Sequence, residues 1–236
     1  MPAGFDREVA SIAPRASSAV PEATDRSGTY RSSLPPQTLS QRFWGLDFSN
    51  GLPRTLSNDG VHGARGELSR VREFLEREFP TFTEEELGAQ LDPRMADAKR
   101  AYLLKACDLI EMRHEDRTVG VIVGAPEDWS SYYVRIFAVS KDYQRRGLVR
   151  RFARESLFQP LIEHRVERVI ADTSPVNLAM TNGFTEMRFY ATGHQLTERW
   201  GALVRYTKFL DPEREAAFYR RFAASLPNRP RKEWTP

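Results

Sequence analysis

The stretch from Tyr132 to Phe152, YYVRIFAVSKDYQRRGLVRRF, decides the fold of this chain. Its first half, through Val139, is rich in aromatic and β-branched residues and is typical of a buried strand. A short polar turn follows, and Gly147 then opens a basic helix. A helix that starts at a glycine presents unpaired backbone N–H groups and a partial positive charge, and both favour an anion. The stretch therefore predicts a phosphate-binding turn between a strand and a helix.

The composition of the whole chain excludes several classes of protein. The net charge of the 236 residues is only +3, so it gives no argument for a nucleic-acid partner. No apolar run reaches the ~18 residues of a membrane span, and the N-terminus lacks the apolar core of a signal peptide. The single cysteine, Cys107, permits no internal disulfide and is expected to be a packing residue in a reducing, cytoplasmic setting. The 4 histidines lack metal-ligand spacing, so we expect no metal.

The chain divides into three predicted regions. Residues 1–40 are rich in Pro, Ser, Ala and Thr, which bury too little apolar surface to offset the entropy of ordering, so disorder is expected there. Residues 41–212 form the predicted domain, and residues 213–236 form a C-terminal helix and tail. Aromatic and aliphatic side chains between Phe43 and Leu52 either pack on the domain or cover its active site.

Hydrophobic periodicity and turn residues place the elements of the domain. The order predicts an α/β (α+β) fold, with a mixed, mostly antiparallel sheet of six to seven strands flanked by helices. Helices are expected over 67–79, from Glu84, from Gly147, from Asn177 to Gly183 and through Leu226; strands are expected near 54–62 and over 103–113, 118–126, 130–140, 165–174, 184–193 and 201–210.

This order of elements resembles the GCN5-related N-acetyltransferase (GNAT) superfamily. The family signature [RQ]-x-x-G-x-[GA] lies between the fourth strand and the following helix, and Gln144, Arg146 and Gly147 occupy its first, third and fourth positions. A second match is ADTSPVN followed by NGF, at the end of the fifth strand and in the short helix after it. The resemblance implies a V-shaped splay between the fourth and fifth strands. Two departures stand out: Val149 replaces a small residue, and no Tyr lies between Asn177 and Phe184.

The resemblance implies that the turn binds acetyl-CoA or another acyl-CoA. Backbone N–H groups from Arg145 to Val149 would surround the pyrophosphate, with Gly147 allowing close approach. Arginine side chains nearby would add charge-assisted contacts, although a basic run is also typical of a solvated face. The donor-binding positions implied are Phe137, Ala138, Val139, Gln144, Arg145, Arg146, Gly147, Leu148, Val149, Arg150 and Asn177.

Transfer to an amine needs a proton acceptor, a polarised carbonyl and a proton for the leaving thiolate. The strand from Tyr132 to Val139 carries no carboxylate, so the base must come from elsewhere. Candidate bases are Asp172 at the end of the fifth strand and Asp108 or Glu111 on the second. A base acting through water and an amine that is already neutral remain alternatives. Tyr190 is the nearest tyrosine that could serve as the acid.

Three functions follow from these residues. The first is an N-acyltransferase that moves an acyl group, acetyl in the leading case, from acyl-CoA to a small-molecule or peptide amine. The second is a long-chain N-acyltransferase that uses fatty acyl-CoA or acyl carrier protein, since strands 184–193 and 201–210 resemble the far half of N-acyl amino acid and acyl-homoserine-lactone synthases. The third is a catalytically silent module that binds acyl-CoA. The oligomeric state is left open, a homodimer included.

Overall fold

The computed structural model describes residues 37–53, 55–56, 60–80, 98, 102, 106–197 and 200–222. All described elements belong to one unit, residues 36–236. Residues 1–36, the predicted helix from Glu84 and the tail beyond Phe222 lie outside the described residues. No helix in the part of the chain that the structure describes is both long and apolar enough to cross a membrane.

The elements follow the predicted order closely. They are α1 (Leu39–Trp44), β1 (Val61–Arg65), α2 (Leu68–Glu78), β2 (Asp108–His114), β3 (Arg117–Pro126), β4 (Ser131–Val139), the short 3₁₀ turn η1 (Lys141–Tyr143), α5 (Leu148–Ala153), the π-helical turn η2 (Arg154–Phe158), α6 (Gln159–Glu163), β5 (Arg168–Thr173), α7 (Leu178–Glu186), β6 (Tyr190–Thr197), β7 (Gly201–Phe209) and α8 (Pro212–Phe222).

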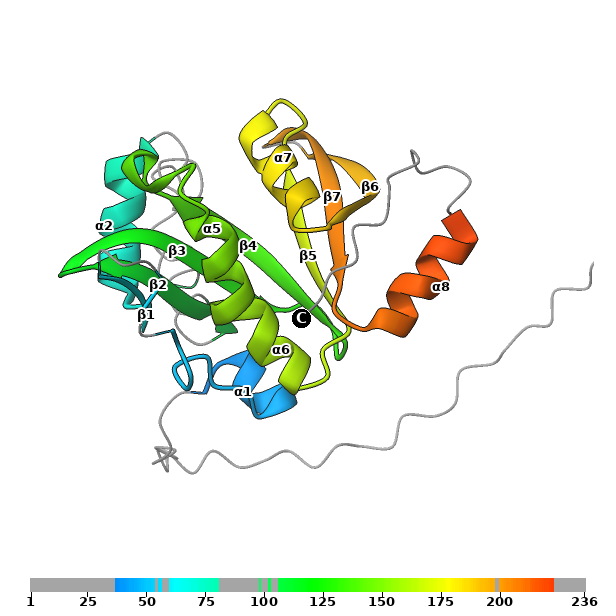
Figure 1. Cartoon of the computed structure of the whole chain (residues 1–236), viewed down its shortest axis with the longest axis horizontal. Coiled ribbons are helices and arrows are strands. Elements are labelled where there is room, and N and C mark those ends of the chain that lie inside the picture. The colour runs from blue at the N-terminus through cyan, green and yellow to red at the C-terminus, as the bar shows by residue number, and fades with distance from the viewer. Residues whose placement is uncertain are drawn as a thin grey trace, which may run out of the picture. The chain divides into compact units, whose positions relative to one another are not determined.

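The strands form one 7-stranded sheet in the order β1-β2-β3-β4-β5-β7-β6 (Figure 1). Every neighbouring pair is antiparallel except β4 and β5, which are parallel. The connection between these two strands is the helical run α5, η2 and α6, as a parallel crossover requires. The predicted mostly antiparallel, mixed sheet flanked by helices is therefore confirmed.

The parallel pair β4 and β5 is short and opens into a fork. Its register runs from Ser131 opposite Arg168 to Val134 opposite Ala171, and no pair follows, although β4 continues to Val139 and β5 to Thr173. Figure 1 shows the two strands side by side at one end and apart at the other. The predicted splay is thus present, and it begins directly after Val134.

Two apolar clusters cover the two faces of the sheet. The larger one joins the sheet to α5, η2, α6 and α7 through buried side chains that include Phe152, Leu161 and Phe184. The smaller one packs α2, through Phe74 and Leu75, against β3 and β4. The fork therefore has α5 and α7 on one face of the sheet and α2 on the other.

Several sequence-based boundaries were wrong. The first strand was expected near 54–62 but is β1 at Val61–Arg65, and the second was expected over 103–113 but is β2 at Asp108–His114. Residues 39–40 begin a helix inside the region predicted to be disordered, because Thr38 and Gln41 form a capping box at its start. The helix from Asn177 does not end at Gly183: it continues to Glu186 and ends before Arg188, whose φ is 62°. The following strand therefore starts at Tyr190, not at residue 184.

Candidate active site

The turn between β4 and α5 is held by hydrogen bonds to neighbouring strands. The Ser140 amide donates to the Val119 carbonyl on β3 at 2.9 Å. The Gln144 side-chain amide donates to the Val139 carbonyl, the last of β4, at 3.0 Å. Arg145 and Gly147 both have left-handed backbones, with φ of 61° and 72°. These contacts fix a tight turn with two left-handed positions, of which glycine, the residue that adopts this conformation without strain, fills the second.

Gly147 is the N-cap of a long helical run. No side chain caps this end, and α5, η2 and α6 continue without a break from Leu148 to Glu163. A Cβ added to Gly147 would meet no atom within 4 Å, so the space before the helix is open. Leu148 is buried and Val149 is half-buried against the core, which anchors the first turn. The helix start thus combines uncapped N–H groups with open space beside Gly147, a combination that suits an anion.

The basic residues beside the turn divide into two groups. Arg151 and Arg154 both contact Glu155, and Arg151 also donates to the Leu56 carbonyl at 3.1 Å. Arg146 lies over the ring of Tyr143, 5.1 Å from its centroid. Arg145 and Arg150 are exposed on either side of the helix start. The first group stabilises the helix, whereas the other three arginines lie within three residues of Gly147 in the sequence.

The fork leaves one edge of β4 without a partner strand among the described residues. Phe137, Ala138 and Val139 pair with β3 on one side, but the pairing with β5 has already ended at Val134. A strand edge of this kind offers backbone N–H and C=O groups to an extended ligand. The predicted donor-binding residues of β4 therefore lie along an open edge that leads to the turn.

Asp172 directly follows Ala171, the last residue of β5 that pairs with β4, and so lies where the fork begins. Arg205 on β7 donates to both carboxylate oxygens, from Nε at 3.0 Å and Nη2 at 3.1 Å. Tyr133 on β4 donates to the same carboxylate at 3.2 Å, and Gln195 on β6 does so at 3.1 Å. One carboxylate thus joins four neighbouring strands, an arrangement that stabilises the paired end of the fork.

The groups around Asp172 keep their ordinary charges. Burial, followed by the neighbouring Asp172 charge, raises the pKa of Tyr133 to about 12, so this phenol stays protonated. Hydrogen bonding to Asp172 raises the pKa of Arg205. Arg205 also contacts Glu127 at 3.3 Å. The cluster is therefore an Asp172–Arg205 ion pair to which Tyr133 and Gln195 add hydrogen bonds, so the Asp172 carboxylate already has partners before any substrate binds.

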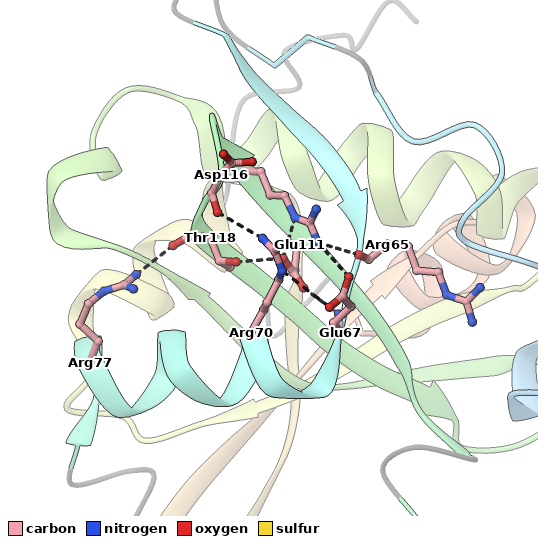
Figure 2. A network of polar contacts seen from close by, with 8 residues as sticks. Arg65, Glu67, Arg70, Arg77, Glu111, Asp116 and Thr118 are labelled. Atoms are coloured by element: carbon pink, nitrogen blue, oxygen red, sulfur yellow. Dashed lines mark hydrogen bonds and ion pairs between the residues drawn. The ribbon is translucent and has the colours of Figure 1, made fainter.

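Glu111 lies on the α2 face of the sheet in a closed network (Figure 2). Its carboxylate is fully buried and accepts from the Glu67 amide at 2.7 Å, the Thr118 hydroxyl at 2.9 Å and Arg113 Nε at 2.8 Å. Arg70 and Arg77 extend the network to the backbone of Asp116 and Thr118. These contacts tie the start of α2 to β2 and β3 and give Glu111 a structural role.

Tyr190 is bound to α8 and not to the fork. Its hydroxyl donates to Glu215 at 2.7 Å, and its ring packs against Phe209 and Phe218. Burial and this hydrogen bond raise the pKa of Tyr190 to about 12. The structure therefore brings Asp172 to the fork but does not bring Glu111 or Tyr190 together with it.

Three other predicted residues have defined places. Asn177 is the N-cap of α7, where its side chain accepts from the Met180 amide at 3.2 Å, beyond the carboxyl end of β5. Asp108 is the first residue of β2, and its buried carboxylate accepts a hydrogen bond from the Ser40 hydroxyl of α1. Cys107 is buried, and this burial raises its thiol pKa to about 11, which fits a packing residue. In the described residues no group of His, Cys, Asp and Glu could hold a metal ion.

Sequence reasoning missed the partners that define these sites. Tyr133, Gln195 and Arg205 were not singled out, although each carries a polar side chain within a strand. His114 lies just beyond the strand predicted over 103–113, yet its Nδ1 lies 2.6 Å from the Tyr143 hydroxyl beside the turn between β4 and α5. A register for β4, β5, β7 and β6 would have brought the first group together, because residues opposite each other share a face.

The structure thus combines a mixed sheet forked at one parallel pair with a glycine-capped helix after its fourth strand. A family model described as the acetyltransferase (GNAT) family matches residues 68–191, more than half of the 236 residues. The chain therefore belongs to the GNAT family.

Solved structures share this fold at low sequence identity. An acetyltransferase from Salmonella typhimurium that modifies the N-terminal serine of ribosomal protein L7/L12 is 11% identical, with a TM-score of 0.52 and coverage of 67% of this chain and 99% of that chain. A GNAT-family acetyltransferase from Desulfovibrio desulfuricans is 16% identical, with a TM-score of 0.48 and coverage of 64% of this chain and 99% of that chain. A GNAT-family acetyltransferase from Elizabethkingia anophelis with acetyl-CoA bound is 10% identical, with a TM-score of 0.47 and coverage of 65% of this chain and 99% of that chain. At these identities the likeness shows the fold alone. No curated protein matches the chain.

Proposed function

We propose that this protein is an N-acyltransferase that transfers an acyl group, acetyl in the leading case, from acyl-CoA to a primary amine. The observation that carries the proposal is the pairing of the glycine-capped helix start with the open edge of β4 that leads to it. In a member of the GNAT family, this pairing supports binding of a long thioester donor with phosphates at one end.

The residues present fit such a donor. The open space before Gly147 admits the pyrophosphate, whose charge suits the N–H groups from Arg145 to Val149. The open edge of β4, from Phe137 to Val139, suits the amides of the pantetheine arm and the thioester carbonyl. Gln144 keeps the turn on the end of β4, and Asn177 stands across the fork at the start of α7.

The chemistry we propose is direct attack by a neutral amine. The amine nitrogen forms a bond to the thioester carbon, the carbon–sulfur bond breaks, the amine proton passes to water, and the CoA thiolate leaves. Glu111 and Tyr190 are bound in other parts of the fold, and Asp172 is paired with Arg205. These three side chains are therefore engaged elsewhere in the part of the chain that the structure describes, and the proposal assigns the rate enhancement to positioning and carbonyl polarisation.

The test combines donor binding with thiol release. Acetyl-CoA should raise the melting temperature of the wild-type chain, because a ligand that binds only the folded state stabilises it. The Gly147→Trp variant, which fills the open space, should lose this shift. Free thiol should then be measured with acetyl-CoA and a panel of small amines and peptides, including peptides with an N-terminal serine. Stabilisation only by long-chain acyl-CoA or acyl carrier protein would indicate that the transferred group is a long acyl chain and not acetyl. No response to any donor would refute the proposal.

A second candidate function is an acyl-CoA-binding module without catalysis. The engagement of all four predicted catalytic side chains, Asp108 included, in structural contacts favours it, as does Val149 at a position where the family prefers a small residue. Donor binding without thiol release for any amine in the panel would support this module over the enzyme. A cytoplasmic location remains part of both proposals.

A further inference from the structure

The turn that precedes α5 is connected to a strand far away in the sequence. The Tyr143 hydroxyl and His114 Nδ1 lie 2.6 Å apart, and the two rings meet edge to face with centroids 5.8 Å apart. Tyr143 belongs to the η1 turn, whereas His114 is the last residue of β2. Both side chains are half-buried, so water competes only weakly for this hydrogen bond.

His114 is a rigid anchor. It pairs with Val61 on β1 and with Arg117 across the β2–β3 hairpin, so two strands hold its backbone. The Tyr143 amide donates to the Ser140 carbonyl, and the Ser140 amide donates to β3. The ring of Tyr143 is therefore fixed at its backbone and again at its hydroxyl.

The same ring also contacts a cation of the turn. The Arg146 guanidinium lies 5.1 Å from the Tyr143 ring centroid, in the range of a cation–π contact. Arg146 follows the strained Arg145, whose φ of 61° is unfavourable for a side chain with a Cβ. A strained turn needs fixed neighbours to keep one shape, and the Tyr143 ring supplies one directly beside Arg146.

We propose that His114 and Tyr143 are positioning residues for the acyl donor, which hold Arg146 and the turn from Gln144 to Gly147 in the shape that receives the donor's phosphates. This inference rests on the proposed function, since it concerns the same donor. Tyr143 acts through its ring on Arg146 and through its hydroxyl on His114. Neither residue needs to touch the donor itself.

The test measures CoA affinity by calorimetry in the full chain. Tyr143→Phe keeps the ring and removes only the hydroxyl, and it should weaken CoA binding about fivefold, as should His114→Ala. Matched controls are Tyr219→Phe on α8 and His62→Ala on β1, which leave the turn intact and should bind CoA as wild type does. Melting temperatures of the variants verify that all of them fold.

A double-mutant cycle separates positioning from general stability. If Tyr143 acts through Arg146, Tyr143→Ala combined with Arg146→Ala should bind CoA no more than about twofold more weakly than Arg146→Ala alone. Fully additive losses, or wild-type affinity in both Tyr143→Phe and His114→Ala, would overturn the inference while leaving the proposed function intact. Failure of the wild-type chain to bind CoA would overturn the proposed function, and the inference with it.

Discussion

Asp108 carries the sharpest prediction about stability. This carboxylate begins β2 and is buried between the sheet and α1, where it accepts from the Ser40 hydroxyl and from the Tyr132 hydroxyl at 3.3 Å. Its contacts are hydrogen bonds from neutral groups, and they do not offset the loss of hydration. Burial consequently raises the pKa of the Asp108 carboxyl from 3.8 to about 6. The change we consider is Asp108→Asn, which keeps the shape and a hydrogen-bond acceptor but removes the titration.

The magnitude follows from the difference between the two pKa values. Because the folded-state pKa lies above the unfolded one, Asp108 contributes stability that is fully present below about pH 4 and is lost as the pH rises through about 6. A difference of about two pKa units, at 1.36 kcal/mol each, corresponds to about 3 kcal/mol. The Asn variant lacks this loss, so its stability relative to wild type should rise by about 3 kcal/mol between pH 4 and pH 8.

Urea unfolding of both proteins across this pH range measures the effect. Taking the difference between variant and wild type cancels the titration of all other groups, and any packing change from the substitution adds a constant. Asp116→Asn, at an exposed position in the β2–β3 turn, is the control and should show a difference independent of pH. An Asp108→Asn difference that is also independent of pH would refute the reasoning.

Three further predictions concern other buried or strained positions. Glu111→Gln should lower the free energy of unfolding by about 3 kcal/mol in urea titrations, because its partners lose a buried charge, whereas exposed Glu73→Gln should change it by less than about 0.5 kcal/mol. Gly147→Ala should cost about 1 kcal/mol from its positive φ alone, while Gly124→Ala, whose Cβ would lie 2.5 Å from a tyrosine ring, should cost about 3 kcal/mol by the same measurement. Cys107 should resist a thiol reagent such as dithionitrobenzoate in the native state and react once unfolded; rapid native labelling would contradict its burial.

The strands and the turn were predictable because their signals are local. A continuous apolar run such as that from Val119 to Val123 needs burial on both faces, and a glycine before a basic helix needs no distant partner. The helix at residues 39–44 was missed for the opposite reason. Its Thr38–Gln41 capping box is visible in the sequence, but the burial that stabilises it comes from contacts such as that between Ser40 and Asp108, which are 68 positions apart.

The candidate site could be predicted only in part. The turn is one continuous segment, so its residues had to lie together. Glu111 and Tyr190 could not be assessed, because their partners include the N-cap of α2 and a side chain of α8, elements that the sequence places but does not orient. A carboxylate in a strand is as compatible with a structural network as with catalysis until its partners are known. Asp172 was correctly placed at the end of a strand, but its ion pair with Arg205 depends on register.

The fork itself has a local cause in β4. Arg135 is an extra residue in the β3–β4 ladder, since Gly124 pairs with Val134 and Val123 with Ile136. Before this bulge Val134 faces the α5 side of the sheet, and after it Ile136 faces the α2 side, so the strand reverses its faces. The parallel pairing with β5 ends at Val134, directly before the same bulge. The bulge that re-aims the strand therefore also ends its pairing, and one extra residue produces the open edge on which the proposed donor site depends.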